Sequence, residues 1–296
     1  MAREHIRRWK IGEVEIVRIV ELFELRGIND IIFQDCSRER ALRHPWLRPY
    51  YAEADGSLKM NFQAFAVRAG DRRIMVDTCI GNDKHRQAPI FHKIQTTFLD
   101  DLAYAGFPAA SIDTVLCTHL HMDHVGWNTR LEGSRWVPTF PNARYLFNRG
   151  EWDFIHSLID KEGAETDQLP DSLQPVYDAG LVDFVSTEHR ISPELTLEPT
   201  PGHTPGHVSV RIESAGQCAV ITGDLMHHPI QCGEPDLKTN FCNDHEESIR
   251  TRRRFLERYE GRAGYVIGSH FCDPTGGWID REGEVWRFHP DMTGSG

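Results

Sequence analysis

The chain has 296 residues, of which 40% are hydrophobic and 26% are charged, values typical of a globular protein that can bury a substantial core. Its net charge of −11 at pH 7 disfavours nucleic acid and other polyanions as partners. No apolar run approaches the ~20 residues of a membrane span, and no apolar signal-peptide segment follows the basic N-terminus. We therefore expect a cytoplasmic protein with no nucleic-acid or membrane partner.

The seven cysteines are scattered along the chain, and no two of them form a C-x-x-C pair. An odd number without paired spacing argues against a disulfide framework and against a thiolate zinc site. The cysteines are most simply small apolar or neutral side chains that fill space.

Strands and helices alternate along most of the chain. A first strand is predicted over residues 11–25, and residues 62–67 and 73–77 predict a hairpin. Further strands are predicted over 112–117, 143–147, 181–185, 195–199, 208–212, 218–222 and 265–267, helices over 95–105, 150–160 and 246–259, and a polar loop over 161–175. Because no linker or repeat divides this pattern, we expect a single layered α/β domain over residues 1–296.

Residues 27–60 form an irregular, aromatic-rich segment with few clean periods. Such a segment is usually either a packing arm or a lid over a site. We favour an N-terminal arm that serves as a lid.

The strongest chemical signal is the stretch Thr118–Gly126, which follows the predicted strand 112–117. It places His119, His121, Asp123 and His124 within six residues, on a loop at the end of a buried strand. Without a metal ion, so many buried imidazole and carboxylate groups would be costly. Imidazole and carboxylate ligands together suit zinc, iron or manganese.

Three later stretches each place one more ligand-type residue after an apolar run. His203 lies in a tight glycine- and proline-rich loop, Asp224 follows strand 218–222, and His270 follows strand 265–267. Strand ends that converge on one edge of a layered sheet would bring these groups together.

The pattern H-x-H-x-D-H, followed by P-G-H, G-D and G-S-H, resembles the metallo-β-lactamase superfamily over residues 60–270. This resemblance implies a four-layer αβ/βα sandwich with a metal pair at one edge of the two sheets. It assigns His119, His121 and His203 to one metal ion, Asp123, His124 and His270 to the second, and Asp224 to a bridge between them. It also places Asp77 behind the ligand loop as its support.

Within the superfamily, the chain resembles the branch of acyl-homoserine-lactone lactonases and methyl-parathion-type phosphotriesterases. No cysteine replaces a ligand, and the bridging aspartate is present. Lactonases of this branch carry a tyrosine three residues after that aspartate, whereas this chain has His227, which can also donate a hydrogen bond. His207 lies outside the ligand set that the family implies.

These residues predict a dinuclear zinc hydrolase, with two Zn²⁺ ions and with Fe or Mn as alternatives. Metal coordination lowers the pKa of water from 15.7 to about 7, so a metal-bridging hydroxide would attack a small lactone or ester. Asp123 would carry the proton, and His227 would steady the oxyanion or the leaving group.

Three other functions stay open at this point. A phosphotriesterase uses the same machinery. An iron-dependent redox enzyme such as a persulfide dioxygenase is disfavoured by the complete ligand set, and di-iron relatives usually carry a glutamate at the position of His121. A metal-stabilised binding protein without turnover is the third. A homodimer is left open.

Overall fold

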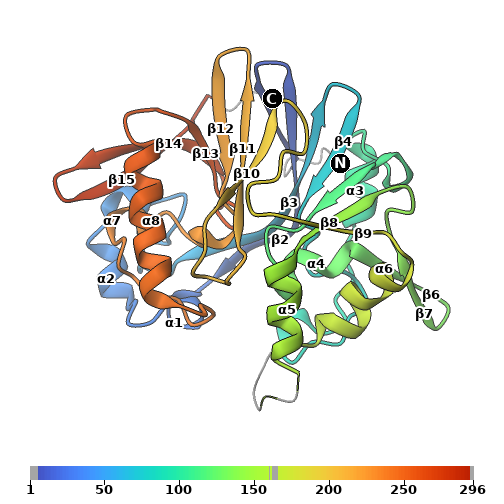
Figure 1. Cartoon of the computed structure of the whole chain (residues 1–296). Coiled ribbons are helices and arrows are strands. Elements are labelled where there is room, and N and C mark those ends of the chain that lie inside the picture. Colours follow the sequence, from blue (N-terminus) through green and yellow to red (C-terminus); the bar gives the residue numbers. More distant parts are fainter. Residues whose placement is uncertain (1–5, 160, 162–165, 294–296) are drawn as a thin grey trace.

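The computed structural model describes residues 6–159, 161 and 166–293. Two twisted sheets pack face to face, and helices cover the outer face of each (Figure 1). This arrangement confirms the predicted four-layer αβ/βα sandwich.

The first sheet, within the described residues, has the strand order β1-β2-β3-β4-β5-β8-β9. Strands β1 to β4 pair antiparallel, and β4, β5, β8 and β9 pair parallel. The strands are β1 (Arg7–Ile11), β2 (Val14–Arg26), β3 (Lys59–Ala69), β4 (Arg72–Val76), β5 (Thr114–Leu116), β8 (Arg144–Asn148) and β9 (Val182–Val185).

The second sheet has the order β10-β11-β12-β13-β14-β15 in the same part of the chain. Only β12 and β13 pair parallel in it, and the other neighbours are antiparallel. The strands are β10 (Leu195–Pro199), β11 (Val208–Ser214), β12 (Gln217–Ile221), β13 (Tyr265–Ile267), β14 (Gly276–Glu282) and β15 (Val285–Pro290), and a separate hairpin is formed by β6 (Thr129–Glu132) and β7 (Arg135–Pro138).

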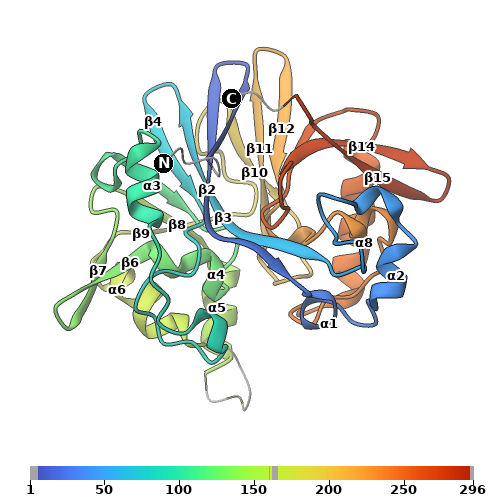
Figure 2. The same ribbon diagram turned by 180° about the vertical axis from the view of Figure 1, so that it is seen from behind.

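The helices divide between the two outer faces. In Figure 1, α3, α5 and α6 lie beside the first sheet and α8 lies beside the second. Figure 2 shows α1 and α2 near α8, and both helices belong to residues 27–60, called the N-terminal segment below. The helices are α1 (Asn29–Ile32), α2 (Arg38–Leu42), α3 (Phe98–Tyr104), α4 (Met122–Val125), α5 (Arg149–Ser157), α6 (Gln174–Asp178), α7 (Ile230–Gly233) and α8 (His245–Tyr259). None of the helices in the described residues has both the length and the apolar character that a membrane span requires.

Side-chain alternation along the strands explains the layering, because successive side chains of a strand point to opposite faces. In β2, Ile16 belongs to the apolar cluster between the two sheets, which also contains Val210 of β11. Its neighbour Val17 belongs to the cluster under α3, α5 and α6. A third cluster joins the outer face of the second sheet to α8 and to the N-terminal segment, including Phe255 and Leu47.

Within the described residues, the prediction of a loop over 161–175 is wrong at its C-terminal end. Residues Leu169–Leu173 form a π-helical turn that continues into α6, because Leu173 and Val176 are buried against the first sheet. Packing of two apolar side chains thus overrides a polar local sequence. Residues 162–165 of this loop lie outside the described part.

Candidate metal centre

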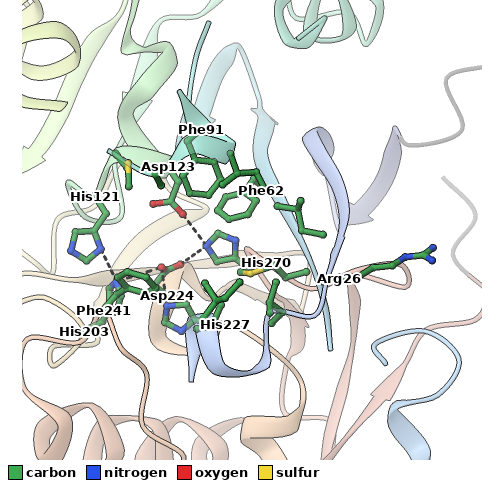
Figure 3. A pocket seen from close by; sticks show the side chains of 18 residues that line it. Arg26, Phe62, Phe91, His121, Asp123, His203, Asp224, His227, Phe241 and His270 are labelled. Carbon is green, nitrogen blue, oxygen red and sulfur yellow. Dashed lines mark hydrogen bonds and ion pairs between the residues drawn. The ribbon is translucent and has the colours of Figure 1, made fainter. Parts of the chain in front are cut away.

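The seven predicted ligands meet at one edge of the sandwich, where strands of both sheets end. Figure 3 labels the ligands that line the pocket, which are His121, Asp123, His203, Asp224 and His270. The chain leaves β5 shortly before His119, and α4 presents Asp123 and His124. The loop between β10 and β11 carries His203, and the chain leaves β12 and β13 shortly before Asp224 and His270. The carboxyl ends of these strands therefore place chemically active loops side by side, as the sequence predicted.

His119, His121 and His203 form the first ligand set together with Asp224, and one ligand atom from each lies within 4.8 Å of the others. Nδ1 of His121 lies 3.1 Å from Nε2 of His119 and 2.9 Å from Nε2 of His203. Three imidazole nitrogens thus converge on one point.

Asp123, His124 and His270 form the second set, again with Asp224. Oδ2 of Asp123 lies 3.5 Å from Nε2 of His124 and 3.5 Å from Nε2 of His270. The two imidazole nitrogens lie 3.3 Å apart.

Asp224 divides its carboxylate between the two sets. Its Oδ1 lies 3.2 Å from Nε2 of His124 and 3.0 Å from Nε2 of His270. Its Oδ2 lies 3.4 Å from Nε2 of His203 and 3.8 Å from Nε2 of His119. Each oxygen of this carboxylate therefore faces one of the two ligand sets.

Groups outside the ligand sets hold the rings in place. The carboxylate of Asp77 contacts Nδ1 of His124 at 2.9 Å and accepts hydrogen bonds from the backbone N–H and the hydroxyl of Thr118. Nδ1 of His270 donates to the carbonyl of Asn61 at 2.8 Å. Such contacts turn Nε2 of both rings toward the centre of the site. The predicted supporting position of Asp77 agrees with this geometry, and its φ of +60° is uncommon for a residue other than glycine.

Burial and neighbouring charges determine which groups are protonated. Burial, reinforced by neighbouring histidines, lowers the pKa of His119 and His203 well below the ordinary value. Burial also lowers the pKa of His121 to about 4. For His124 burial acts in the same direction, but the surrounding carboxylates outweigh it and raise the pKa well above its ordinary value. The first set therefore presents neutral imidazoles, the form that binds metal ions.

The residues present fit metal ions. Converging imidazole lone pairs and a buried carboxylate are unfavourable without a positive charge between them. Among the described residues, Nδ1 of His203 has no hydrogen-bond partner. A donor set of imidazole and carboxylate is the kind that zinc, iron and manganese accept.

An apolar cavity of about 200 Å³ opens over the ligands (Figure 3). His227 lies in its wall, with Nε2 3.2 Å from Oδ2 of Asp224. The lining comes from residues 25–32, from β3, from residues 88–91, from α4, from both ligand sets and from two later side chains outside those sets: Leu25, Arg26, Ile28, Ile31, Ile32, Met60, Phe62, Ala88, Ile90, Phe91, His121, Met122, Asp123, His203, Asp224, His227, Phe241 and His270.

Several of these wall residues carried no signal in the sequence. Ile31, Ile90 and Phe241 are exposed apolar side chains from separate parts of the chain, and only packing brings them together. His207 is buried outside the ligand sets, where its Nε2 accepts the backbone N–H of Asp224 at 2.8 Å. That contact agrees with the prediction that His207 lies outside the ligand sets.

A sequence profile of the family described as Metallo-beta-lactamase superfamily matches residues 63–270. This chain belongs to the metallo-β-lactamase superfamily. The matched segment contains all seven predicted ligands as well as Asp77. The family predicted from the histidine motif is therefore confirmed.

The chain is similar to characterised members of this superfamily. The N-acyl homoserine lactonase AttM of Rhizobium radiobacter is 29% identical over 200 residues, which cover 62% of this chain and 67% of AttM. The solved structure of AidC, a dizinc quorum-quenching lactonase, matches with a TM-score of 0.77 at 21% identity over 97% of both chains. The hydrolase AbOPH matches with a TM-score of 0.79 at 22% identity, again over 97% of both. The structural matches show the fold, and with the metallo-β-lactamase family and the lactonase relatives they support a metal-dependent hydrolase.

Proposed function

We propose that this member of the metallo-β-lactamase superfamily is a dinuclear zinc hydrolase that opens small lactones or cleaves small esters. The observation that carries the proposal is the Asp224 carboxylate, whose two oxygens serve two complete ligand sets beneath an apolar cavity. The AttM relatives, which are N-acyl homoserine lactonases, favour a lactone as the first substrate class to test.

Two metal ions bound here would polarise the substrate carbonyl group and lower the pKa of a water molecule to about 7. The protein supplies the remaining functions. Asp123, whose side chain is 17% exposed at the cavity, can accept a proton and pass it to the leaving oxygen. His227 is placed to donate a hydrogen bond to the developing oxyanion or to the leaving group.

The cavity favours neutral substrates. Arg26 is the one lysine or arginine among its described lining residues. Its guanidinium pairs with Glu24 at 3.0 Å and with Glu53 at 3.2 Å, and it points away from the ligands in Figure 3. A charged substrate group that lies against this wall, away from the ligands, would therefore find no unpaired cation there, and its desolvation would be costly.

Metal content and substrate range test this proposal together. Elemental analysis of the purified chain should give about two zinc ions per chain. A panel should contain an N-acyl lactone, an aryl ester, an aryl phosphotriester and, as the matched anionic control, the aryl phosphodiester. We expect turnover of the lactone or ester, and faster turnover of either than of the phosphodiester. Preference for the phosphotriester would favour that alternative, and about one iron per chain without hydrolysis would overturn the proposal.

A further inference from the structure

We propose that Glu151 is a positioning residue that fixes both loops of the first ligand set and thereby sets the affinity of that metal site. This inference rests on the proposed function only in requiring that metal ions bind. Glu151 lies in the first turn of α5 and is 1% exposed. It contributes no ligand atom to either set.

The carboxylate of Glu151 joins two loops that are far apart in the sequence. Its Oε1 accepts the backbone N–H of Gly206 at 2.7 Å, and its Oε2 accepts the backbone N–H of Leu120 at 3.3 Å. Leu120 stands between the ligands His119 and His121, and Gly206 follows the ligand His203 by three residues. One buried side chain thus holds the backbone between His119 and His121 and the loop that carries His203.

The peptide groups around Leu120 are held from a second side as well. Its carbonyl accepts a hydrogen bond from Nε2 of Gln168 at 2.9 Å. Because Glu151 takes the N–H and Gln168 the C=O, rotation of the backbone between His119 and His121 would break a buried hydrogen bond in either direction.

The start of α5 is built to hold the carboxylate there. Asn148 caps the helix, and its Oδ1 accepts the backbone N–H of Gly150 at 2.8 Å. The loop of Gly206 is pressed against this cap, since a Cβ at that position would lie 2.2 Å from Oδ1 of Asn148. The loop, the cap and the carboxylate therefore form one closely packed unit.

The second ligand set has a different support. Asp77 contacts Nδ1 of His124, while Glu151 contacts the loops of the first set. Asp77 also holds Thr118 beside His119 and so supports both sets, whereas the hydrogen bonds of Glu151 to Leu120 and Gly206 reach only the loops of the first set. Loss of the Glu151 carboxylate should weaken the first site and spare the second, which a general role in stability would not do.

The test isolates the two sites by removing one ligand from each. H270A removes a ligand of the second set, and H203A removes a ligand of the first. E151Q is added to each, because glutamine keeps the size of the side chain but turns an amide NH₂ toward one of the two backbone N–H groups. D153N, on the exposed neighbour Asp153 of the same helix, is the matched control.

Zinc affinity is measured by competition with a chromophoric chelator, on full-length chains whose folding is verified by near-ultraviolet circular dichroism. We expect E151Q to weaken zinc binding roughly 10- to 100-fold in the H270A chain and less than about threefold in the H203A chain. D153N should change neither affinity. If a double variant does not fold, E151Q alone should weaken one of the two zinc-binding steps of the wild-type chain.

Equal effects in both backgrounds, or no effect in either, would overturn the positioning role while leaving the metal site intact. Failure of the wild-type chain to bind zinc would overturn the proposed function and this assignment with it. The two failures are therefore distinguishable.

Discussion

His227 is buried in the cavity wall, where its Nε2 lies 3.2 Å from Oδ2 of Asp224 and its Nδ1 has no hydrogen-bond partner among the described residues. Its ring lies parallel to that of His270, with the centroids 5.9 Å apart, and edge-on to Phe33 at 6.4 Å. A buried imidazole without a hydrogen bond is costly. Under the proposed function, a substrate oxygen beside the ligands would supply this partner.

We expect H227F to reduce kcat roughly 100-fold, the usual loss when one oxyanion donor is removed. Metal content should not change, because His227 belongs to neither ligand set. H227Y should keep much of the activity, since a phenol hydroxyl can donate the same hydrogen bond. Steady-state kinetics with elemental analysis check this. Loss of zinc from H227F would show a ligand role, and an unchanged kcat would remove His227 from the chemistry.

At the scale of elements, residues 84–94 between β4 and α3 bring Ile90 and Phe91 to the cavity and are anchored by the buried amine of Lys84. Nζ of Lys84 donates to the hydroxyl of Thr129 at 2.5 Å and to the carbonyl of Asp171 at 3.0 Å. It also lies 3.7 Å above the centre of the Trp136 ring. Burial lowers the pKa of Lys84 from 10.5 to about 7, although Asp171 opposes the shift.

This anchor predicts a pH-dependent stability. Between about pH 7 and pH 10 the unfolded chain keeps the proton on Lys84 and the folded chain releases it, so stability rises with pH by at most ~1.4 kcal/mol per pH unit. The free energy of unfolding of the wild type, relative to K84M, should therefore increase from pH 7 to pH 9. Urea denaturation measures it, with K93M on the exposed Lys93 of the same segment as control. If the free energy of unfolding of the wild type relative to K93M rose with pH in the same way, Lys84 would not be the source of the pH dependence.

The sequence predicted those elements whose apolar residues repeat cleanly. The hairpin of β3 and β4 and helix α8 follow from such periods, whereas the hairpins β6–β7 and β14–β15 were missed because exposed polar residues interrupt them. The ligands were predicted because a motif places them near strand ends. Glu151 was not, because a single glutamate at a helix start looks like a solvated charge until the fold buries it.

For the whole molecule, each ligand set joins the two sheets. His119, His121, Asp123 and His124 follow β5 of the first sheet, whereas His203, Asp224 and His270 extend from the second. A metal ion held by either set would therefore cross-link the two halves of the sandwich. Removing it leaves converging imidazoles and a shared carboxylate in a buried space, which favours separation of the halves.

Chelation should consequently lower the melting temperature by roughly 10 °C or more. Each bound ion adds about 2.7 kcal/mol to the free energy of unfolding when the free ion concentration is 100 times its Kd. Differential scanning calorimetry before and after treatment with a chelator measures the shift, and added zinc should reverse it. D224N, which alters the carboxylate shared by both sets, should have a lower melting temperature than the wild type, and the chelator should change that temperature little. If metal-free wild type melted at the original temperature, the contacts of Asp77, Glu151 and Asn61 alone would suffice to hold the ligand loops, and the ions would serve chemistry without stabilising the fold.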